Sequence, residues 1–114
     1  IKDTHFPNRM QIFAAFGKFT AVLHERGILH PDYSMGNVLF EPNEQGAQFQ
    51  LVDLNRMQFG QKVNCRKGCR NFERIDADVQ ALSAIARAYA QARGFDEEEC
   101  IRLVLKMRWR KHKK

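Results

Sequence analysis

Apolar residues near the start of the chain recur every three or four positions, the spacing that places them on one face of an α-helix. They are Ile12, Phe13, Phe16, Val22 and Leu23, with Phe19 nearby. Asn8 before this segment suits the capping position of a helix, and Gly27 after it suits the left-handed conformation in which many helices end. We therefore predict a helix over residues 9–26 with this face buried.

After this helix the pattern changes to short apolar runs separated by polar residues. Residues 28–29 and 38–40 are apolar runs too short for helices, residues 41–46 favour a turn, and residues 49–53 are typical of a returning strand. We predict a β-hairpin over residues 38–52 with its tip at residues 43–46. Residues 54–74 show no sustained period, and we expect them to form a long ordered loop.

Helical spacing returns in the last third of the chain. Asp78 suits a capping position and Gly94 a helix stop, so we predict a second helix between them. Its apolar face consists of Val79, Leu82, Ile85, Ala86 and Tyr89. Asp96 and Glu99 form another capping pattern, and we predict a third helix that buries Ile101, Val104 and Leu105. The fold class is therefore expected to be α+β and mostly helical, with a small β-hairpin.

The composition narrows the class of protein. A hydrophobic content of 44% in 114 residues fits one globular domain with a modest core. No apolar run approaches the roughly 20 residues of a membrane-spanning helix, and no signal segment opens the sequence. The chain has three cysteines, Cys65, Cys69 and Cys100, so they cannot all be paired in disulfides within the chain. Because no signal segment is present either, we expect reduced thiols in a cytosolic compartment. A zinc site at the C-x-x-x-C pair would need two more ligands, and unpaired thiols are the default expectation.

The net charge of +6 is concentrated at the C-terminus. Residues 106–114 carry six basic residues and no acidic one, which leaves residues 1–105 with 13 bases and 13 acids. A neutral body argues against a broad nucleic-acid-binding face, so we expect no nucleic acid partner. The basic tail, Lys106–Lys114, with Trp109 would suit peripheral contact with an anionic membrane; a frayed end that only aids solubility is the alternative.

Polar residues with metal-binding character flank the predicted hairpin. We expect a strand end at residues 28–29 to deliver His30 and Asp32, while Asn37 enters the first strand of the hairpin. Asp53 ends the second strand, so two carboxylates and an amide should lie within a few ångströms. Such hard oxygen ligands suit Mg²⁺, and they would serve phosphoryl transfer by neutralising phosphate charge and accepting a hydroxyl proton. Taken singly, these residue types are also common in ordinary turns.

Three segments carry a resemblance to a known family, namely GILHPDYSMGNVLF, FQLVDLNRMQFG and GCRNFER. The order His-x-Asp-x-x-x-x-Asn, then a hairpin, then apolar-apolar-Asp resembles the catalytic loop and metal-binding strand of the protein-kinase-like superfamily. The finer match is to the lipopolysaccharide kinases of the Kdo/WaaP type. It extends from about Ile12 to Phe95, which is most of the chain.

The resemblance implies a role for each residue of the motif. Asp32 would be the catalytic residue that positions the acceptor hydroxyl. Asn37 and Asp53 would bind Mg²⁺ beside the phosphates of ATP. His30 would support the site structurally, by bracing the loop against the strand of Asp53; a core role of this kind is favoured over acid–base chemistry.

Three further residues are candidates for contacts with phosphate or substrate: Ser34, Asn55 and Arg56. Ser34 stands where Ser/Thr protein kinases often carry a phosphate-contacting Lys, which points to small-molecule or sugar kinases. Asn55 and Arg56 could equally serve only to order their loop. The basic residues that follow would suit an anionic sugar or lipid headgroup, or form an ordinary solvated loop; they are Arg66, Lys67, Arg70 and Arg74.

The sequence has no Gly-x-Gly-x-x-Gly loop, a part of the smaller N-terminal lobe in kinase-like folds. The first residue is Ile1, and we expect the chain to be cut from a longer protein that supplies this absent lobe. The resemblance thus implies a kinase-like C-terminal lobe over residues 1–105, with its catalytic loop at 28–40 and its metal-binding strand at 49–53. Alone, this lobe is expected to bind ATP weakly and to have negligible turnover.

The function implied by the resemblance is ATP-dependent phosphorylation of a sugar hydroxyl on the lipopolysaccharide inner core, Kdo or heptose. The partners would be a nucleotide and a sugar or glycolipid, and the enzyme would be bacterial and cytoplasmic, at the inner membrane. Two alternatives stay open. One is a kinase-like phosphotransferase with another small-molecule or protein substrate, and the other is a non-catalytic pseudokinase or basic-tailed binding module.

Overall fold

The computed structural model describes residues 9–31, 33–44, 46–52 and 57–113. In chain order the elements are α1 (Arg9–Glu25), a 3₁₀ turn (Met35–Asn37), β1 (Val38–Asn43), β2 (Gly46–Leu51), α2 (Cys65–Arg70), α3 (Val79–Arg93) and α4 (Glu97–Lys113). The expectation of a mostly helical α+β chain with one small antiparallel hairpin is confirmed. The capping prediction for Asn8 lies outside the described residues.

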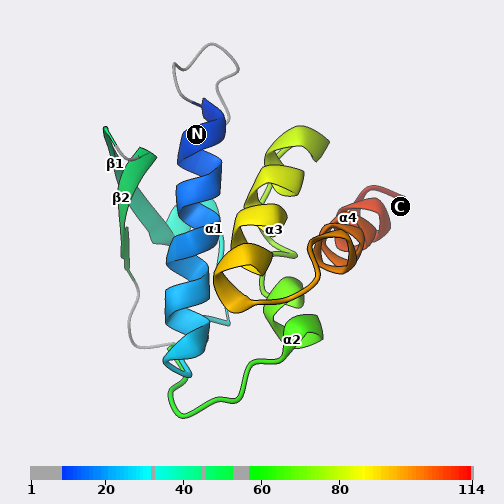
Figure 1. Ribbon diagram of the computed structural model, residues 1–114, viewed down its shortest axis with the longest axis horizontal. Coiled ribbons are helices and arrows are strands. Elements are labelled where there is room, and N and C mark those ends of the chain that lie inside the picture. The colour runs from blue at the N-terminus through cyan, green and yellow to red at the C-terminus, as the bar shows by residue number, and fades with distance from the viewer. Residues whose placement is uncertain (1–8, 32, 45, 53–56, 114) are drawn as a thin grey trace.

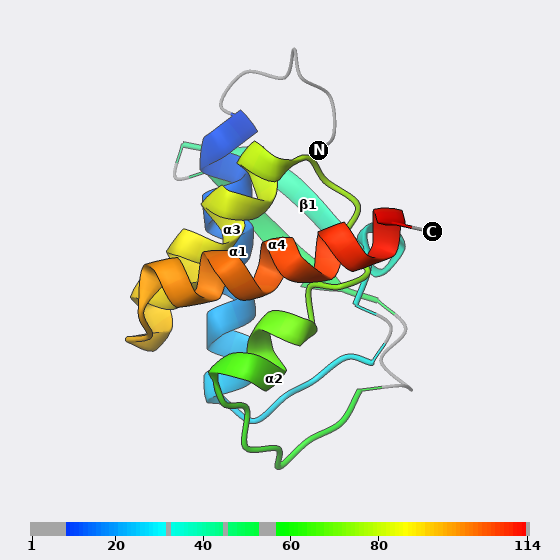
Figure 2. The ribbon, with the colours of Figure 1, turned by 90° about the vertical axis from the view of Figure 1, so that its right-hand side faces the viewer.

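The elements are arranged in layers around α1 (Figure 1). The hairpin packs on one side of α1 and α3 packs on the other, with α4 on the outer side of α3. Helix α2 lies against α4, below the crossing of the longer helices in the turned view (Figure 2). Both sides of α1 therefore bury side chains, and the core extends from the hairpin to α4.

Helix α1 has the predicted extent, but its buried face is partly polar. Buried on it are Ile12, Phe13, Phe16, Gly17, Thr20, Ala21 and His24. The predicted burial of Val22 is wrong, because this side chain is 48% exposed. Val22 lies two positions after the buried Thr20 and so projects from the opposite side of the helix. The error came from following apolar residues alone, whereas Thr20 and His24 continue the buried stripe.

The hairpin is confirmed at the predicted residues. Its register pairs Val38 with Leu51 and Phe40 with Phe49, and the strands end at the expected turn. Phe49 faces α1, where its ring centroid lies 5.4 Å from that of Phe16. The opposite face of the hairpin is exposed to solvent, including the apolar side chain of Leu39, which is 55% exposed.

Helix α3 begins and ends where its capping residues predicted. The Asp78 carboxylate accepts a hydrogen bond from the Ala81 N–H (2.8 Å), and Gly94 has a φ of 74°, in the left-handed region. The predicted burial of Val79 is wrong, since its side chain is 48% exposed. As the first residue of the helix, Val79 precedes the turn that packs on α1. The rest of the predicted face is buried.

Helix α4 begins with the predicted cap, in which Asp96 accepts a hydrogen bond from the Glu99 N–H at 2.9 Å. It continues as one helix to Lys113, through most of the basic segment. Trp109 in this segment is 60% exposed. Among the described residues, every helix is too short or too polar to cross a membrane.

The expectation of one long ordered loop over residues 54–74 is wrong for residues 65–70, which form α2. The Asn64 side chain caps this helix by accepting a hydrogen bond from the Lys67 N–H at 2.8 Å. Gly68, in the middle of α2, packs against Tyr89 so closely that an added Cβ would collide with the phenol oxygen. A segment of six residues is too short to show a helical period, so the sequence pattern did not predict α2. The helix is stabilised by tertiary packing, with Gly68 and Cys69 buried in the core.

Candidate active site

The loop that carries the predicted catalytic residues begins at Leu29. Leu29 and Gln58 exchange two backbone hydrogen bonds, of 2.9 and 2.7 Å, in an isolated antiparallel bridge. The expected strand end at residues 28–29 is therefore a single bridged residue rather than part of a regular strand. Its partner Gln58 comes from the far side of the Asp53 segment, so residues on both sides of that segment contact the loop.

His30 is buried, with 2% of its surface exposed. Its Nε2 lies 3.2 Å from the carbonyl oxygen of Val52, the residue directly before Asp53. Because a carbonyl oxygen only accepts, Nε2 is the donor. The backbone oxygen of His30 in turn accepts a hydrogen bond from the Asn71 amide at 3.1 Å. His30 is thus joined to the hairpin by its ring and to the end of α2 by its backbone.

Tyr33 is a second buried residue of this loop, and sequence reasoning missed it. Its ring stacks on Phe16 with centroids 5.4 Å apart, and its hydroxyl is hydrogen bonded to the Thr20 hydroxyl at 2.5 Å. Burial raises the pKa of the Tyr33 phenol well above its ordinary value, so it stays neutral. An aromatic residue in an otherwise polar, glycine-containing loop was the signal that could have identified this anchor.

The end of the loop is joined to the hairpin through Asn37. The turn of residues 35–37 is closed by a hydrogen bond of 3.0 Å from the Asn37 N–H to the Ser34 carbonyl. The Asn37 carbonyl then accepts a hydrogen bond from the Val52 N–H, also at 3.0 Å. Val52 therefore uses its N–H for Asn37 and its carbonyl for His30, which brings the two ends of the loop to one residue of the hairpin.

Four of the predicted site residues lie outside the described residues: Asp32, Asp53, Asn55 and Arg56. The predicted convergence of the Asp32 and Asp53 side chains with Asn37 stays a prediction. The described neighbours fit it, because Val52 precedes Asp53 and contacts Asn37. Two carboxylates and one amide also have the donor chemistry that Mg²⁺ prefers.

The support behind the loop is a chain of hydrogen bonds that sequence reasoning did not find. The Tyr89 hydroxyl lies 2.6 Å from His24 Nδ1, and His24 Nε2 lies 2.9 Å from the Asn71 side-chain oxygen. Asn71 then donates to the His30 carbonyl, so three helices and the loop share one network. Asn71 belongs to the GCRNFER segment, whose resemblance to the family was noted without a role for this residue.

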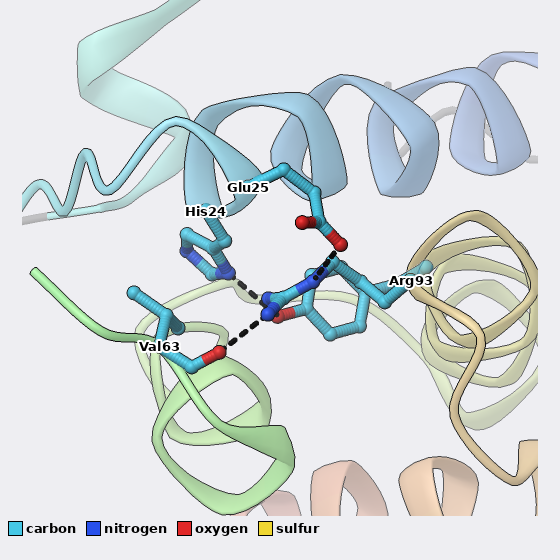
Figure 3. A network of polar contacts seen from close by, with 5 residues as sticks. His24, Glu25, Val63 and Arg93 are labelled. Atoms are coloured by element: carbon cyan, nitrogen blue, oxygen red, sulfur yellow. Dashed lines mark hydrogen bonds and ion pairs between the residues drawn. The ribbon is translucent and has the colours of Figure 1, made fainter.

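The direction of this network requires a neutral His24. An Arg93 N–H donates to the Tyr89 hydroxyl at 2.6 Å, which leaves the phenol proton free to point to His24 Nδ1. Burial lowers the pKa of His24 to about 4, the Asn71 hydrogen bond opposes this shift, and the Arg93 charge adds to it. Figure 3 shows how Arg93 also reaches the Glu25 carboxylate, at 2.8 Å, and the Val63 carbonyl.

The exposed side of the hairpin borders an open groove of ≈ 500 Å³. Its lining residues are Leu39, Phe40, Glu41, Gln48, Phe49 and Gln50. The groove combines apolar and amide groups with one carboxylate. Leu39, which lines the groove, lies two residues after Asn37 at the end of the loop.

A family model described as the lipopolysaccharide kinase (Kdo/WaaP) family matches residues 4–99. The matched segment includes the whole loop, the hairpin, α2 and α3. The comparisons with curated proteins and with solved structures gave no significant match.

Proposed function

Because the chain belongs to the lipopolysaccharide kinase (Kdo/WaaP) family, we propose that it transfers the γ-phosphoryl group of ATP to a sugar hydroxyl of the lipopolysaccharide inner core. The resemblance seen in three sequence segments is thereby confirmed, over most of the chain. The observation that carries the proposal is the double contact of Val52. This residue joins Asn37 and His30, at the two ends of the loop, to the strand that precedes Asp53.

In this proposal Asp32 accepts a hydrogen bond from the acceptor hydroxyl, orients it and takes its proton as the phosphoryl group transfers. Asn37 and Asp53 hold Mg²⁺, which neutralises charge on the phosphates of ATP. Ser34 lies in the same loop and would contact phosphate or substrate, as would Asn55 and Arg56. His30 and Tyr33 do no chemistry and keep Asp32 in place, because each is buried and lies within two residues of it.

The groove beside the hairpin is proposed to receive the nucleotide. An exposed leucine offers apolar surface for a planar base, and the groove begins where the metal-binding residues end. We further propose that the described chain is the larger lobe of a kinase-like fold. A smaller lobe with a glycine-rich hairpin and a strand Lys would then cover the groove and hold the phosphates.

We also propose that the enzyme works at the cytoplasmic face of the inner membrane. The basic residues at the end of α4 and the exposed Trp109 would meet anionic headgroups there. Binding to vesicles with anionic lipids, measured by co-sedimentation, should fall on deletion of residues 106–114. Equal binding with and without this segment would contradict the proposal for the membrane.

The test of the phosphotransfer proposal is a substitution series in the enzyme that carries both lobes. Asp53→Asn should abolish transfer of labelled γ-phosphate from ATP to inner-core oligosaccharide, with circular dichroism unchanged. Asp32→Asn should do the same while nucleotide binding is retained. Glu44→Gln, an exposed carboxylate at the hairpin turn, is the matched control and should keep full activity. Activity of Asp53→Asn equal to that of the control would remove Asp53 from the mechanism.

A second test uses the 114-residue chain alone. We expect weak binding of Mg-ATP in a calorimetric titration, because the proposed smaller lobe supplies half of the nucleotide site. Binding at low micromolar concentration would show that this lobe is not needed.

A further inference from the structure

The three cysteines of the chain meet at one point between α2 and α4. Cys65 and Cys69 lie four residues apart on α2, and Cys100 lies in the first turns of α4. Their three sulfur atoms are all within 4.8 Å of one another, and the Sγ atoms of Cys65 and Cys100 are 3.5 Å apart. Cys69 and Cys100 are fully buried, while Cys65 is half-buried. Sequence analysis weighed a metal site only at Cys65 and Cys69 and did not foresee that Cys100 joins them.

These distances are close to those of a metal–thiolate centre. Zinc binds a thiolate sulfur at about 2.3 Å, so three sulfurs at tetrahedral angles lie about 3.8 Å from one another. The sulfur atoms of Cys65 and Cys100 are 3.5 Å apart, slightly less than this value, and no pair of the three is beyond 4.8 Å. Shifts of about 1 Å or less, within the reach of cysteine rotamers, would bring them to the required geometry.

We propose that Cys65, Cys69 and Cys100 form a binding site for one thiophilic divalent metal ion, with zinc as the ion. Thiolates select soft and borderline ions over Mg²⁺, so this site would not compete with the phosphotransfer site for its metal. Among the described residues the group contains no fourth protein ligand, and the fourth position is left to water on the half-buried side of Cys65.

The local structure supports a metal here beyond simple packing of thiols. Helix α2 has six residues and a central glycine, so it is poorly stable by itself. A metal bound to both its cysteines and to Cys100 would fasten it to α4.

The metal would also support the loop described above. Asn71 directly follows α2 and donates to the His30 carbonyl, so fixing α2 on α4 fixes this hydrogen bond. The proposed role of the metal is to hold α2 on α4, and metal binding can be measured without any assay of phosphotransfer.

The experiment is a titration of the full, reduced chain with Co²⁺ under anaerobic conditions. We expect one equivalent to bind, with a sulfur-to-cobalt charge-transfer band and the intense visible absorption of a tetrahedral cobalt ion. Added Zn²⁺ should bleach both. Chain expressed in zinc-supplemented medium should contain one zinc per molecule by mass spectrometry of the metal. Absence of the charge-transfer band in chain shown to be folded by circular dichroism would overturn the proposal.

Substitutions identify the ligands. Cys65→Ser and Cys100→Ser should each remove one of the three thiolates. The charge-transfer band should then weaken by a third or more, and cobalt affinity should fall tenfold or more. Arg66→Ala, on the same helix with no thiol changed, is the matched control and should bind as the wild type does. Because Cys65 is half-buried and is the first residue of α2, its serine variant should keep the fold even if Cys100→Ser does not. An unchanged band in folded Cys65→Ser, or rapid formation of a disulfide in place of metal binding, would contradict the proposal.

Discussion

The core around α1 and the loop of residues 29–37 are held in place by different kinds of interaction. Around α1, apolar and aromatic side chains pack closely, with Phe16 completely buried. The loop is instead held by hydrogen bonds to Val52 and Asn71, with Tyr33 as its main packed anchor. A lost core contact should therefore lower the stability of the whole domain. A lost contact to the loop should displace the loop at a smaller cost in stability.

Phe16→Ala tests the packed side of this comparison and should have the largest effect. Its ring contacts Tyr33, Phe49 and Phe72, with centroid distances of 5.4, 5.4 and 6.1 Å. Removing a buried phenyl ring leaves a cavity, and the free energy of unfolding should fall by about 3–5 kcal/mol. Urea unfolding followed by circular dichroism measures this change.

Val22→Ala on the same helix is the control for Phe16→Ala. Its side chain is mostly exposed, so the expected change is within about 0.5 kcal/mol. A loss of several kcal/mol in the Val22 variant would mean that the face of α1 has been assigned wrongly.

The burial of His24, within the network behind the loop, should make the free energy of unfolding depend on pH. Protonation of His24 in the unfolded chain occurs near its ordinary pKa of about 6.5, whereas the folded protein resists it until about pH 4. The contribution of neutral His24 to the free energy of unfolding is therefore fully present above pH 6.5. It is lost as the pH falls from 6.5 towards 4. Between pH 7.5 and pH 5 the loss should be roughly 2 kcal/mol, in a range where carboxylates remain ionised.

His24→Gln separates this effect from the rest of the titration curve. Glutamine can bond to Asn71 or Tyr89 but does not titrate, so stability should become nearly flat over the same pH range. Chemical unfolding at a series of pH values gives both curves. A wild-type curve without a slope between pH 6.5 and pH 5 would show that His24 is protonated in the folded state as easily as in the unfolded chain.

Asn71→Ala tests the polar side of the comparison. It leaves the His24 Nε2–H and the His30 carbonyl without their partner, which should cost about 1–2 kcal/mol of stability. Amide exchange at Leu29 should become faster, because this residue adjoins the released His30. On the proposed function, kcat in the enzyme with both lobes should fall as well.

Asn64→Ala is the matched control for Asn71→Ala. It removes the cap of α2 at a similar cost of about 1 kcal/mol. Asn64 caps the opposite end of α2 from Asn71, so its loss should leave exchange at Leu29 and kcat unchanged. Equal changes in both variants would mean that loss of α2, and not of the Asn71 bridge, disturbs the loop.

Local signals in the sequence predicted the parts of the fold that depend on neighbours along the chain. The caps at Asp78 and Asp96 use a side chain and an N–H three residues later, and both are found. The hairpin turn at residues 43–46 likewise follows from its own residues. The candidate loop was recognised because its motif lies in one continuous stretch, from His30 to Asn37.

The parts that sequence reasoning missed depend on residues far apart along the chain. Asn71 contacts His30 across 41 positions, and Cys65 contacts Cys100 across 35. The burial of His24 was not predicted, because its partners Tyr89 and Asn71 come from other elements. Such contacts have no periodic signature, and they are what hold the loop.

The smallest expected effect concerns Asp78 at the start of α3, which makes both a local capping hydrogen bond and an ion pair to a residue far away in the sequence. Asp78 accepts the Ala81 N–H and also pairs with Arg9 of α1. Asp78→Ala should cost about 1 kcal/mol through loss of the cap, with little from the half-exposed ion pair. Asp78→Asn keeps an oxygen for the cap and loses the charge, so it should recover most of this stability in urea unfolding. If Asp78→Asn is as unstable as Asp78→Ala, the ion pair to α1 matters more than the cap, and even this terminus depends on a distant contact.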